Sequence, residues 1–477
     1  MTGSGISSRP LHHDAYGFWL HEAGPVTPQP ALTGSISADV VVMGGGYAGM
    51  WTAWNLLDRG ARVVVLEADR CGHGPSGRNG GFVDGLWHAA PRLSQRFGGP
   101  AALALGRAAA DSVRSIGEWC QQEDVDAWYR PAQQLVLAAS PAQDGAGAEV
   151  AEACARMGAG DAAQPISAQE VQRRCASPIL RGGVAIQPAA TVQPARLALG
   201  LRQRLLDKGA LIFERSRVTA LTEDPSGVVA RTAQGEVRAG AGVLAIGCAA
   251  LAARPLARAF TGASSHLVIT EPVPDVLEEL GWTGGEPITD GRSLVHYFRT
   301  TPDGRIAFGW GGGLILPGAR THGRAEVDPG IAATVTRDLQ RFFPMLAGRT
   351  IEHAWGGPID ASPWHLPVIT PLAPSERAAA RLWGVFGFTG NGVGPSHLVG
   401  RILARLALRE SDELTSLPIV EPPVLPVPPE PWRFLGGTVI RTAIERKERA
   451  EESGGRPGPL TALVADLPRR LGYHIGR

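Results

Sequence analysis

The chain has 477 residues, 44% of them hydrophobic and 19% charged, a composition typical of globular proteins. Its formal net charge is +1 and no block of basic residues stands out, which argues against a nucleic-acid partner. No run of about 18 apolar residues occurs, so we expect no transmembrane segment.

The lysines and cysteines indicate which reactions and which cell compartment are to be expected. Lys208 and Lys447 are the only lysines, in a helix end and a charged run, so neither is expected to be the buried amine that Schiff-base chemistry needs. The five cysteines are scattered and form no CxxC pair, which favours a reducing cytoplasm over a disulfide framework. The N-terminus lacks an apolar core of signal-peptide type. We therefore expect a cytoplasmic protein, and the sequence predicts no metal site.

Residues 1–36 form a lead-in that contains Trp19 and is expected to pack on the surface. After it, DVVVM at 39–43 predicts a buried strand, and MWTAWNLLD at 50–58 predicts a helix. RVVVL at 62–66 predicts a second strand. Between the first strand and the helix lies GGGYAG, a GxGxxG motif over 44–49.

This order of strand, glycine turn, helix and strand predicts a dinucleotide site. Gly44 makes the tight turn, Gly46 leaves room for a pyrophosphate, and Gly49 lets the helix pack closely on the strand. The helix N-terminus offers N–H groups to the phosphates. Glu67, at the tip of the second strand, can accept hydrogen bonds from a ribose and would repel a 2′-phosphate. The nucleotide is therefore expected to be FAD or NAD.

A second glycine-rich stretch, GPSGRNGG at 74–81, begins shortly after Glu67. A glycine-rich loop with polar side chains can wrap the pyrophosphate and ribityl part of a long cofactor. FAD needs such a loop more than NAD does, because its flavin end extends across the domain. The residues predicted to contact the cofactor around the two glycine stretches are Tyr47, Ala48, Ala68, Ser76, Gly77, Arg78, Asn79, Gly80 and Gly81.

Later segments alternate between helix and strand patterns. LALGRAAADSVRSIGEWCQQ at 103–122 predicts an amphipathic helix, QQLVLAAS at 133–140 a strand, and SAQE at 167–170 the capped start of a helix. HYFRTTPDGRIAFGW at 296–310 predicts a hairpin that turns at PDG. Residues 418–432 predict a proline-rich extended tether, followed by tail helices near 438–452 and 459–471. The tail is expected to dock, with an oligomer contact or a membrane-surface helix left open.

The segments GGGYAGMWTAWNLLDRGARVVVLEAD and GPSGRNGG resemble the D-amino-acid oxidase superfamily of FAD-dependent oxidoreductases, and the SGRNGG form is most similar to its γ-glutamylputrescine oxidase branch. Segments at 205–221 and 242–250, at 296–310, and at 353–370 and 382–408 extend the resemblance to residues 20–415. It implies an α/β fold with a Rossmann-like FAD-binding domain and a discontinuous antiparallel-sheet substrate domain. The implied boundaries are 37–99, 183–260 and 350–415 for the FAD-binding domain, 100–182 and 261–349 for the substrate domain, and 416–477 for the tether and tail.

The resemblance also implies how FAD is held. The backbone of Val218 would contact the adenine, and the strand that ends at Ala245 and Gly247 would lie against the nucleotide. N–H groups at a helix start near Ser396 would stabilise negative charge on the reduced flavin. No cysteine follows Cys248, so FAD is expected to be noncovalent. The contacts predicted in this closing segment are Gly387, Thr389, Gly390, Asn391, Gly392 and Val393.

The implied reaction oxidises the C–N bond of an amine or amino acid by hydride transfer to flavin N5, and the resulting imine hydrolyses to an aldehyde or keto acid. Tyr297 and Arg299 match a YxR pattern and are substrate-facing candidates, the arginine for a carboxylate. The candidates for an acid–base residue are His88, His296 and His365. The candidates for an aromatic wall around an apolar or cationic amine are Trp87, Trp355 and Trp364.

The electron acceptor is left open between O2 and another acceptor. Relatives of the sarcosine-oxidase type carry a lysine near flavin N5, and the matching position here is Ala307. Two alternatives stay open: an NAD(P)H-dependent flavin monooxygenase, for which no second GxGxxG is found, and a non-catalytic FAD-holding subunit of a larger complex. A homo-oligomer is also left open.

Overall fold

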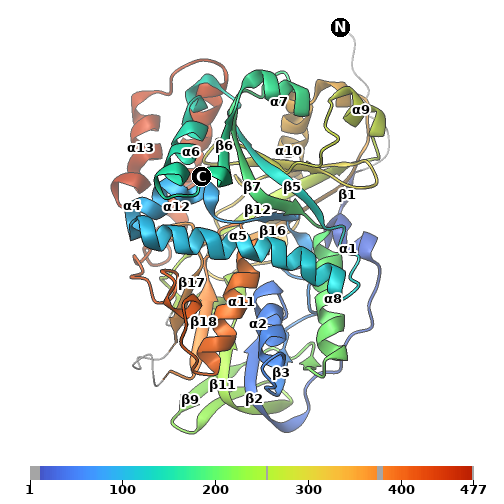
Figure 1. Cartoon of the computed structure of the whole chain (residues 1–477), viewed down its shortest axis with the longest axis vertical. Coiled ribbons are helices and arrows are strands. Elements are labelled where there is room, and N and C mark those ends of the chain that lie inside the picture. Colours follow the sequence, from blue (N-terminus) through green and yellow to red (C-terminus); the bar gives the residue numbers. More distant parts are fainter. Residues whose placement is uncertain (1–10, 254–255, 373–379, 475–477) are drawn as a thin grey trace.

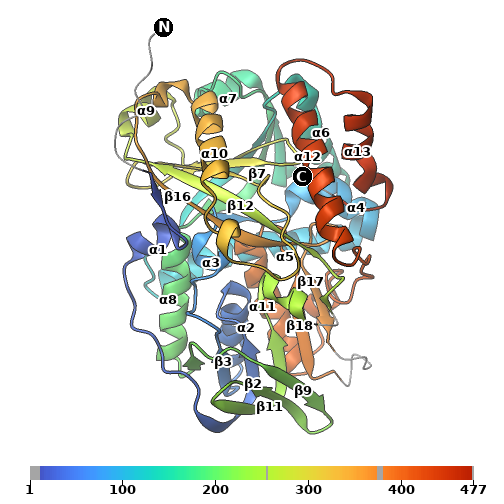
Figure 2. The same cartoon turned by 180° about the vertical axis from the view of Figure 1, so that it is seen from behind.

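Two β-sheets with helices around them make up the protein (Figure 1). The computed structural model describes residues 11–253, 256–372 and 380–474, and within them one sheet has eight strands and the other ten. Strands β2, β3 and β11 of the smaller sheet lie near one end of the long axis, and the larger sheet lies toward the other end (Figures 1 and 2). The expected α/β class is confirmed.

The eight-stranded sheet carries the predicted nucleotide motif. Its order is β17–β18–β11–β2–β3–β8, and β9 and β10 continue it beside β11. The strands from β18 to β8 pair in parallel, as expected for a Rossmann-like sheet. Its bounds are β2 (Gly34–Met43), β3 (Val63–Leu66), β8 (Leu211–Phe213), β9 (Ala220–Asp224), β10 (Gly227–Arg231), β11 (Gly235–Leu244), β17 (Val368–Pro371) and β18 (Leu382–Phe386).

The ten-stranded sheet is mostly antiparallel, in the order β1–β16–β12–β15–β14–β13–β5–β7–β4, with β6 paired to β7. The hairpin predicted at 296–310 is confirmed as β14 and β15, with Phe298 opposite Phe308. The bounds are β1 (His12–His13), β4 (Phe82–Asp84), β5 (Arg130–Leu137), β6 (Ala163–Ile166), β7 (Gly183–Thr191), β12 (Thr261–Thr270), β13 (Ile288–Asp290), β14 (His296–Thr300), β15 (Ile306–Trp310) and β16 (Ile351–Ala361).

The α-helices pack around both sheets, and α5 crosses the middle of the molecule (Figure 1). The Ser167 hydroxyl accepts the Glu170 N–H at 3.2 Å, which confirms the predicted cap of α7. The bounds are α1 (Gly17–Ala23), α2 (Tyr47–Leu57), α3 (Pro75–Arg78), α4 (Ala90–Phe97), α5 (Gly99–Gln122), α6 (Ala146–Arg156), α7 (Ala168–Arg174), α8 (Pro194–Asp207), α9 (Pro274–Glu279), α10 (Pro329–Phe342), α11 (Val393–Ala407), α12 (Trp432–Glu452) and α13 (Pro459–Arg470).

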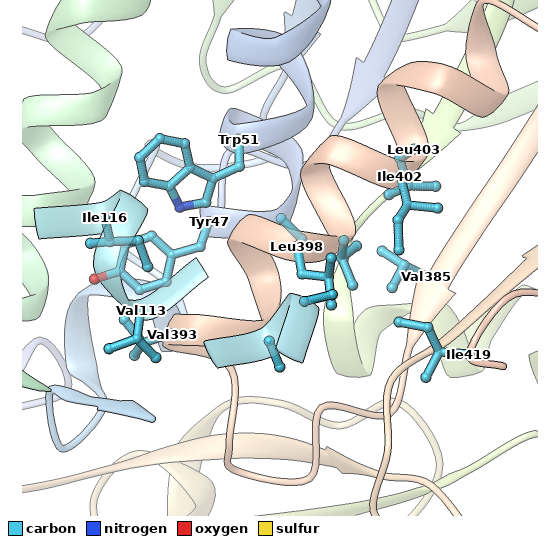
Figure 3. Close-up of a cluster of buried hydrophobic side chains, with 14 of the residues drawn as sticks. Tyr47, Trp51, Val113, Ile116, Val385, Val393, Leu398, Ile402, Leu403 and Ile419 are labelled. Atoms are coloured by element: carbon cyan, nitrogen blue, oxygen red, sulfur yellow. The ribbon is translucent and has the colours of Figure 1, made fainter. Parts of the chain in front are cut away.

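The main core joins α2, α5 and α11, although these helices are far apart in the sequence. Figure 3 shows Tyr47 and Trp51 of α2 beside Val113 and Ile116 of α5, with Leu398 of α11 close by. The fit between α2 and α11 is tight, because a Cβ on Gly400 would lie 2.6 Å from the Trp51 Cβ. Burial of these large side chains fixes the helix that follows the glycine turn, and so fixes the turn itself.

Several boundaries expected from the sequence shift. Strands β4, β7 and β16 fall in the ranges assigned to the FAD-binding domain, yet all three belong to the ten-stranded sheet. Neither the resemblance nor the apolar pattern of a strand identifies the strand with which it pairs, which explains the difference. The lead-in also packs more deeply than expected, because Trp19 is fully buried and meets Trp355 edge to face at 5.9 Å. The closing helix α11 begins at Val393, one turn before the expected start.

The tail forms two helices, as predicted, and docks on the larger sheet. Arg433 at the start of α12 donates to the carbonyls of Ala257 and Phe260, and Glu448 near its end accepts the Ser293 N–H at 2.6 Å. Helix α13 packs beside α12 (Figure 2). Among the described residues, no helix combines the length and apolar character that crossing a membrane requires.

Candidate active site

A cavity of about 1300 Å³ lies where the carboxyl ends of β2, β3 and β11 face the larger sheet. Its wall includes Met43 and Leu244 from the smaller sheet, and Leu267, Tyr297 and Ile359 from the larger one. Pockets for one small molecule span roughly 300–1,000 Å³, so this cavity has room for a long cofactor and a substrate. Ligands of open α/β sheets bind at this edge, outside the carboxyl ends of the strands.

Close contacts exclude a side chain at two positions of the GxGxxG turn, Gly44 and Gly49, and leave little room at a third, Gly46. A Cβ at Gly44 would lie 2.2 Å from the Ala245 carbonyl oxygen, and Gly44 has a φ of +110° that favours glycine. A Cβ at Gly49 would lie 2.0 Å from the Gly44 carbonyl oxygen, and one at Gly46 would lie 3.0 Å from Ser76 Oγ. The first residues of α2 line the cavity, where their N–H groups and the helix dipole can hold phosphate.

Glu67 lines the same cavity directly after β3. Its carboxylate accepts the N–H of Gly45 at 2.7 Å and the N–H of Asp69 at 2.8 Å. Burial raises the pKa of Glu67 above its ordinary value, although these backbone donors oppose the rise. The two contacts fix the carboxylate beside the glycine turn, and each oxygen keeps a lone pair for a ribose hydroxyl.

The GPSGRNGG stretch contains the helical turn α3 rather than an open loop throughout. Arg78, at its end, donates to the Ala15 carbonyl at 2.7 Å and to the Glu326 carboxylate at 2.9 Å. The Trp355 indole N–H donates to the Arg78 carbonyl at 2.8 Å. Arg78 lines the cavity, but these contacts make it first of all a connection between the stretch, the lead-in and the larger sheet.

Two buried aspartates, Asp84 of β4 and Asp360 of β16, line the cavity beside the closing segment. The Asp360 carboxylate accepts the Gly387 N–H at 2.7 Å, and burial raises the pKa of Asp360 to about 6. The Asn391 amide nitrogen, oriented toward Asp84, donates to that carboxylate at 3.3 Å. Gly392 precedes the first turn of α11, so the segment presents helix N–H groups to the cavity, as a flavin ring would require.

Most of the residues predicted for FAD line this one cavity. Those that line it are Gly44, Gly46, Tyr47, Ala48, Glu67, Ala68, Ser76, Arg78, Asn79, Gly80, Val218, Ala245, Gly247, Thr389, Gly390, Asn391, Gly392 and Val393. Those that lie behind the wall are Gly49, Gly77, Gly81 and Gly387. The four glycines behind the wall serve packing, because a Cβ on any of them would come within 2.6 Å of a neighbouring atom.

Tyr297 also lines the cavity, from β14 of the larger sheet. Its hydroxyl lies 2.6 Å from Ser265 Oγ, and Ser265 donates to the Trp310 carbonyl at 3.0 Å. Because Ser265 has one proton to donate, Tyr297 is the donor of the pair, and its oxygen keeps lone pairs for another partner. Burial raises the pKa of Tyr297 far above its ordinary value, so the phenol stays protonated.

Arg299 does not reach the cavity wall. Its side chain is 1% exposed, its guanidinium stacks over the Trp19 ring at 4.9 Å, and Gly81 lies directly against it. Burial lowers the pKa of Arg299 to about 9, and its Nε and Nη2 find no acceptor among the described residues. The YxR pattern therefore places one side chain on the cavity and the other behind the glycine-rich stretch.

Of the histidine and tryptophan candidates, some line the cavity and others do not. His88 and His365 line the cavity. His296 is fully buried elsewhere: burial opposes its charge, but the carboxylates of Asp290 at 2.8 Å and Asp338 at 3.1 Å raise its pKa. The prediction of an aromatic wall is wrong, because none of its three tryptophans lines the cavity: Trp87, Trp355 and Trp364.

The tail supplies a part of the wall that the sequence did not predict. Trp432, Gly437, Ile440 and Arg441 of α12 line the cavity, and so does Tyr473 after α13. No sequence motif pointed to these tail residues, to Asp360 or to Ser265. The only signal in the sequence was the glycine pair Gly436–Gly437 just before the helix predicted near 438–452, and a Cβ on Gly437 would lie 3.3 Å from Ile315.

Comparison with known proteins agrees with this site. The family model described as "DAO: FAD dependent oxidoreductase" matches residues 39–406. The chain therefore belongs to this family of FAD-dependent oxidoreductases, and the expected FAD cofactor is confirmed. The glycines whose missing Cβ atoms leave room for the turn, together with the cavity volume, fit that cofactor. Among the described residues, no group of three or more His, Cys, Asp or Glu could hold a metal ion.

Individual relatives lie at moderate identity. Gamma-glutamylputrescine oxidoreductase of Escherichia coli (strain K12) is 29% identical over 394 residues, covering 82% of this chain and 88% of that protein. The oxidoreductase named OrdL of Rhizobium meliloti (strain 1021) is 28% identical over 436 residues, covering 89% and 94%. The crystal structure of glycine oxidase from Geobacillus kaustophilus aligns with a TM-score of 0.63 at 22% identity, covering 79% and 96%, which shows a shared fold.

Proposed function

We propose that this FAD-dependent oxidoreductase oxidises the C–N bond of a small amine or amino acid. The substrate carbon loses a hydride and the nitrogen loses a proton, which leaves an imine that water converts to an aldehyde or keto acid. FAD supplies the hydride acceptor when it is bound. The residues of the chain bind and orient the amine and exclude water around it.

The observation that carries this proposal is the position of Tyr297. Its ring lies directly against the GPSGRNGG stretch, because a Cβ on Gly80 would be 2.9 Å from the Tyr297 Cε2 atom. The one substrate-facing candidate on the hairpin thus shares a cavity wall with the predicted cofactor loop. A substrate held by Tyr297 would lie beside the cofactor.

Tyr297 is suited to accept a hydrogen bond from an amine. Its own proton is directed to Ser265, so its oxygen offers lone pairs to a substrate N–H. The raised pKa excludes the phenolate as a base near neutral pH. We propose Tyr297 as a positioning residue, and His365 on the same wall as the candidate that takes the amine proton.

The relatives support an amine or amino-acid substrate. One is named a gamma-glutamylputrescine oxidoreductase, at 29% identity over most of both chains.

The electron acceptor that reoxidises the reduced flavin is part of the same proposal. Ala307 is buried beside Trp19, Lys208 pairs with Asp58, and Lys447 pairs with Glu451, so no lysine among the described residues lines the cavity. We propose noncovalent FAD and an acceptor other than O2 as the faster one.

The test is anaerobic addition of an amine and amino-acid panel to the FAD-loaded protein, followed by its visible absorption spectrum. Bleaching of the flavin bands by one class supports the proposal and identifies that class. Bleaching only by NADH or NADPH contradicts it and favours a monooxygenase. Air is then admitted to the reduced enzyme, and slow return of the bands compared with an added dye supports a dehydrogenase.

A further inference from the structure

The tail helices expose an unusual share of the apolar side chains of the protein. Nine large hydrophobic residues are exposed in the described chain, and seven of them lie on α12, on α13 or directly after α13. We name this set the tail face. Its members are Trp432, Leu435, Val439, Leu460, Leu463 and Leu467, together with Leu471 at the end of α13.

The spacing of the tail face is helical. Positions 432, 435 and 439 follow one side of α12, and positions 460, 463, 467 and 471 follow one side of α13. A different side of α12, with Ile444, is already buried against the rest of the protein. Helix α12 is therefore apolar on two sides, and only one of them has a partner in the described part of this chain. Exposed apolar patches of this kind mark interaction surfaces.

The exposed charges around the tail face are all positive. Within residues 432–474 the exposed charged side chains are five arginines and Lys447, whose side chain is 42% exposed, and every carboxylate is buried or half-buried. Three of these arginines pair with half-buried acids: Arg449 with Glu445, and Arg469 and Arg470 with Asp466. The other two are Arg446 and Arg456. Helices that lie in a lipid–water interface typically have an apolar face of leucine and tryptophan with arginines along its border.

We propose that the tail face docks on a lipid bilayer that carries anionic headgroups. A second copy of the chain is the other natural partner for an apolar face. A two-fold dimer, however, places the same patch against itself, and would bring the arginines of both copies together with no exposed carboxylate of residues 432–474 between them. Anionic headgroups remove that conflict, since they pair with the arginines while the leucines enter the apolar layer.

The proposal also gives the cavity a definite orientation. Trp432 and Leu471 belong both to the tail face and to the cavity wall. Docking would bring this rim of the cavity to the bilayer surface, and strands β2, β3 and β11 lie near the other end of the molecule from α13 (Figure 2).

The test is co-sedimentation of the full-length, FAD-loaded protein with vesicles of equal parts phosphatidylcholine and phosphatidylglycerol, and with vesicles of phosphatidylcholine alone. We expect the anionic vesicles to bind the protein and added salt to weaken that binding. The double variant Leu463→Glu with Leu467→Glu should bind at least about tenfold more weakly. Leu211→Glu is the matched control, because Leu211 is similarly exposed, at 51%, but lies on β8.

Retention of the visible flavin spectrum and of the melting temperature shows that each variant is folded. Loss of vesicle binding in the double variant but not in Leu211→Glu supports the proposal. Failure of the unmodified protein to bind either vesicle, or equal binding by the double variant, overturns it. Sedimentation velocity separates the rival occupant: a dimer that the double variant abolishes, without vesicle binding, assigns the tail face to a second copy.

Discussion

Arg78 and Glu326 form a buried ion pair at 2.9 Å, although they lie far apart in the sequence. Arg78 ends the helical turn of the glycine-rich stretch, and Glu326 precedes α10 of the part built on the larger sheet. The same guanidinium donates to the carbonyl of Ala15. One side chain therefore joins three segments at the rim of the cavity and holds the stretch in place.

Glu326→Gln should lower the free energy of unfolding by about 3 kcal/mol, because it leaves a buried guanidinium without its counter-charge. Denaturant unfolding of the FAD-loaded protein measures the change. Asp111→Asn is the matched control, since Asp111 pairs with Arg114 in an exposed contact that is worth about 1 kcal/mol or less. Equal losses in the two variants would show that the Arg78 pair has no special role.

Gly49→Ala should weaken FAD retention by about tenfold or more. The added Cβ would lie 2.0 Å from the Gly44 carbonyl oxygen, so the turn must shift. A shift that costs about 1.4 kcal/mol of binding free energy is already a tenfold loss of affinity. Flavin absorbance per protein after dialysis provides the measurement. Gly99→Ala is the control, because a Cβ there meets nothing within 4 Å, and full retention by the Gly49 variant would contradict the packing role of this glycine.

Tyr297→Phe should lower kcat/KM for the reactive amine by about tenfold, since it removes one hydrogen bond to the substrate and leaves the ring in place. Anaerobic stopped-flow reduction of the flavin measures the effect on the chemical step. Tyr129→Phe makes the same chemical change at a hydroxyl that donates to the Val113 carbonyl outside the cavity. A Tyr297 variant as fast as the Tyr129 variant would remove this residue from the proposed site.

Glu448→Gln should change how stability depends on pH. Burial, helped by the negative charge of Asp290, raises the pKa of Glu448 to about 7 from an ordinary value of 4.5. Between these values the unfolded chain has lost a proton that the folded chain keeps, so stability from this group is present below pH 4.5 and is lost as pH rises through 7. The variant should match the natural protein near pH 4 and exceed its stability by up to about 3 kcal/mol at pH 8. Urea unfolding at both pH values tests this, and a constant difference would refute it.

The nucleotide-binding turn could be predicted from the sequence because its strand, glycines and helix are close together along the chain. The strand at 39–43, the three glycines, the helix and Glu67 follow one another closely along the chain, so the motif could be recognised there even though Gly44 also packs against the distant Ala245. The hairpin at 296–310 was predictable for the same reason, since its turn and its alternation are contained in one short stretch.

The sequence could not predict which candidate side chains line the cavity, because contacts between segments far apart in the chain determine this. Tyr297 and Arg299 point to the same side of β14, yet one lines the cavity and the other is covered by Gly81 and Trp19, both distant in sequence. His296 resembled a candidate base until Asp290 and Asp338 were found on either side of it. The tail contributes to the cavity through a docking geometry that no motif encodes.

The pairing of α2 with α11 has a consequence for how the protein is made. Trp51 leaves the ribosome early, but Gly400, against which it packs, is synthesised only when most of the chain has already been made. At roughly 5–20 residues per second, the nascent chain spends tens of seconds with the apolar face of its first nucleotide helix uncovered. Chaperones that recognise apolar helices would have that interval in which to bind, and the cofactor site can close only near the end of translation.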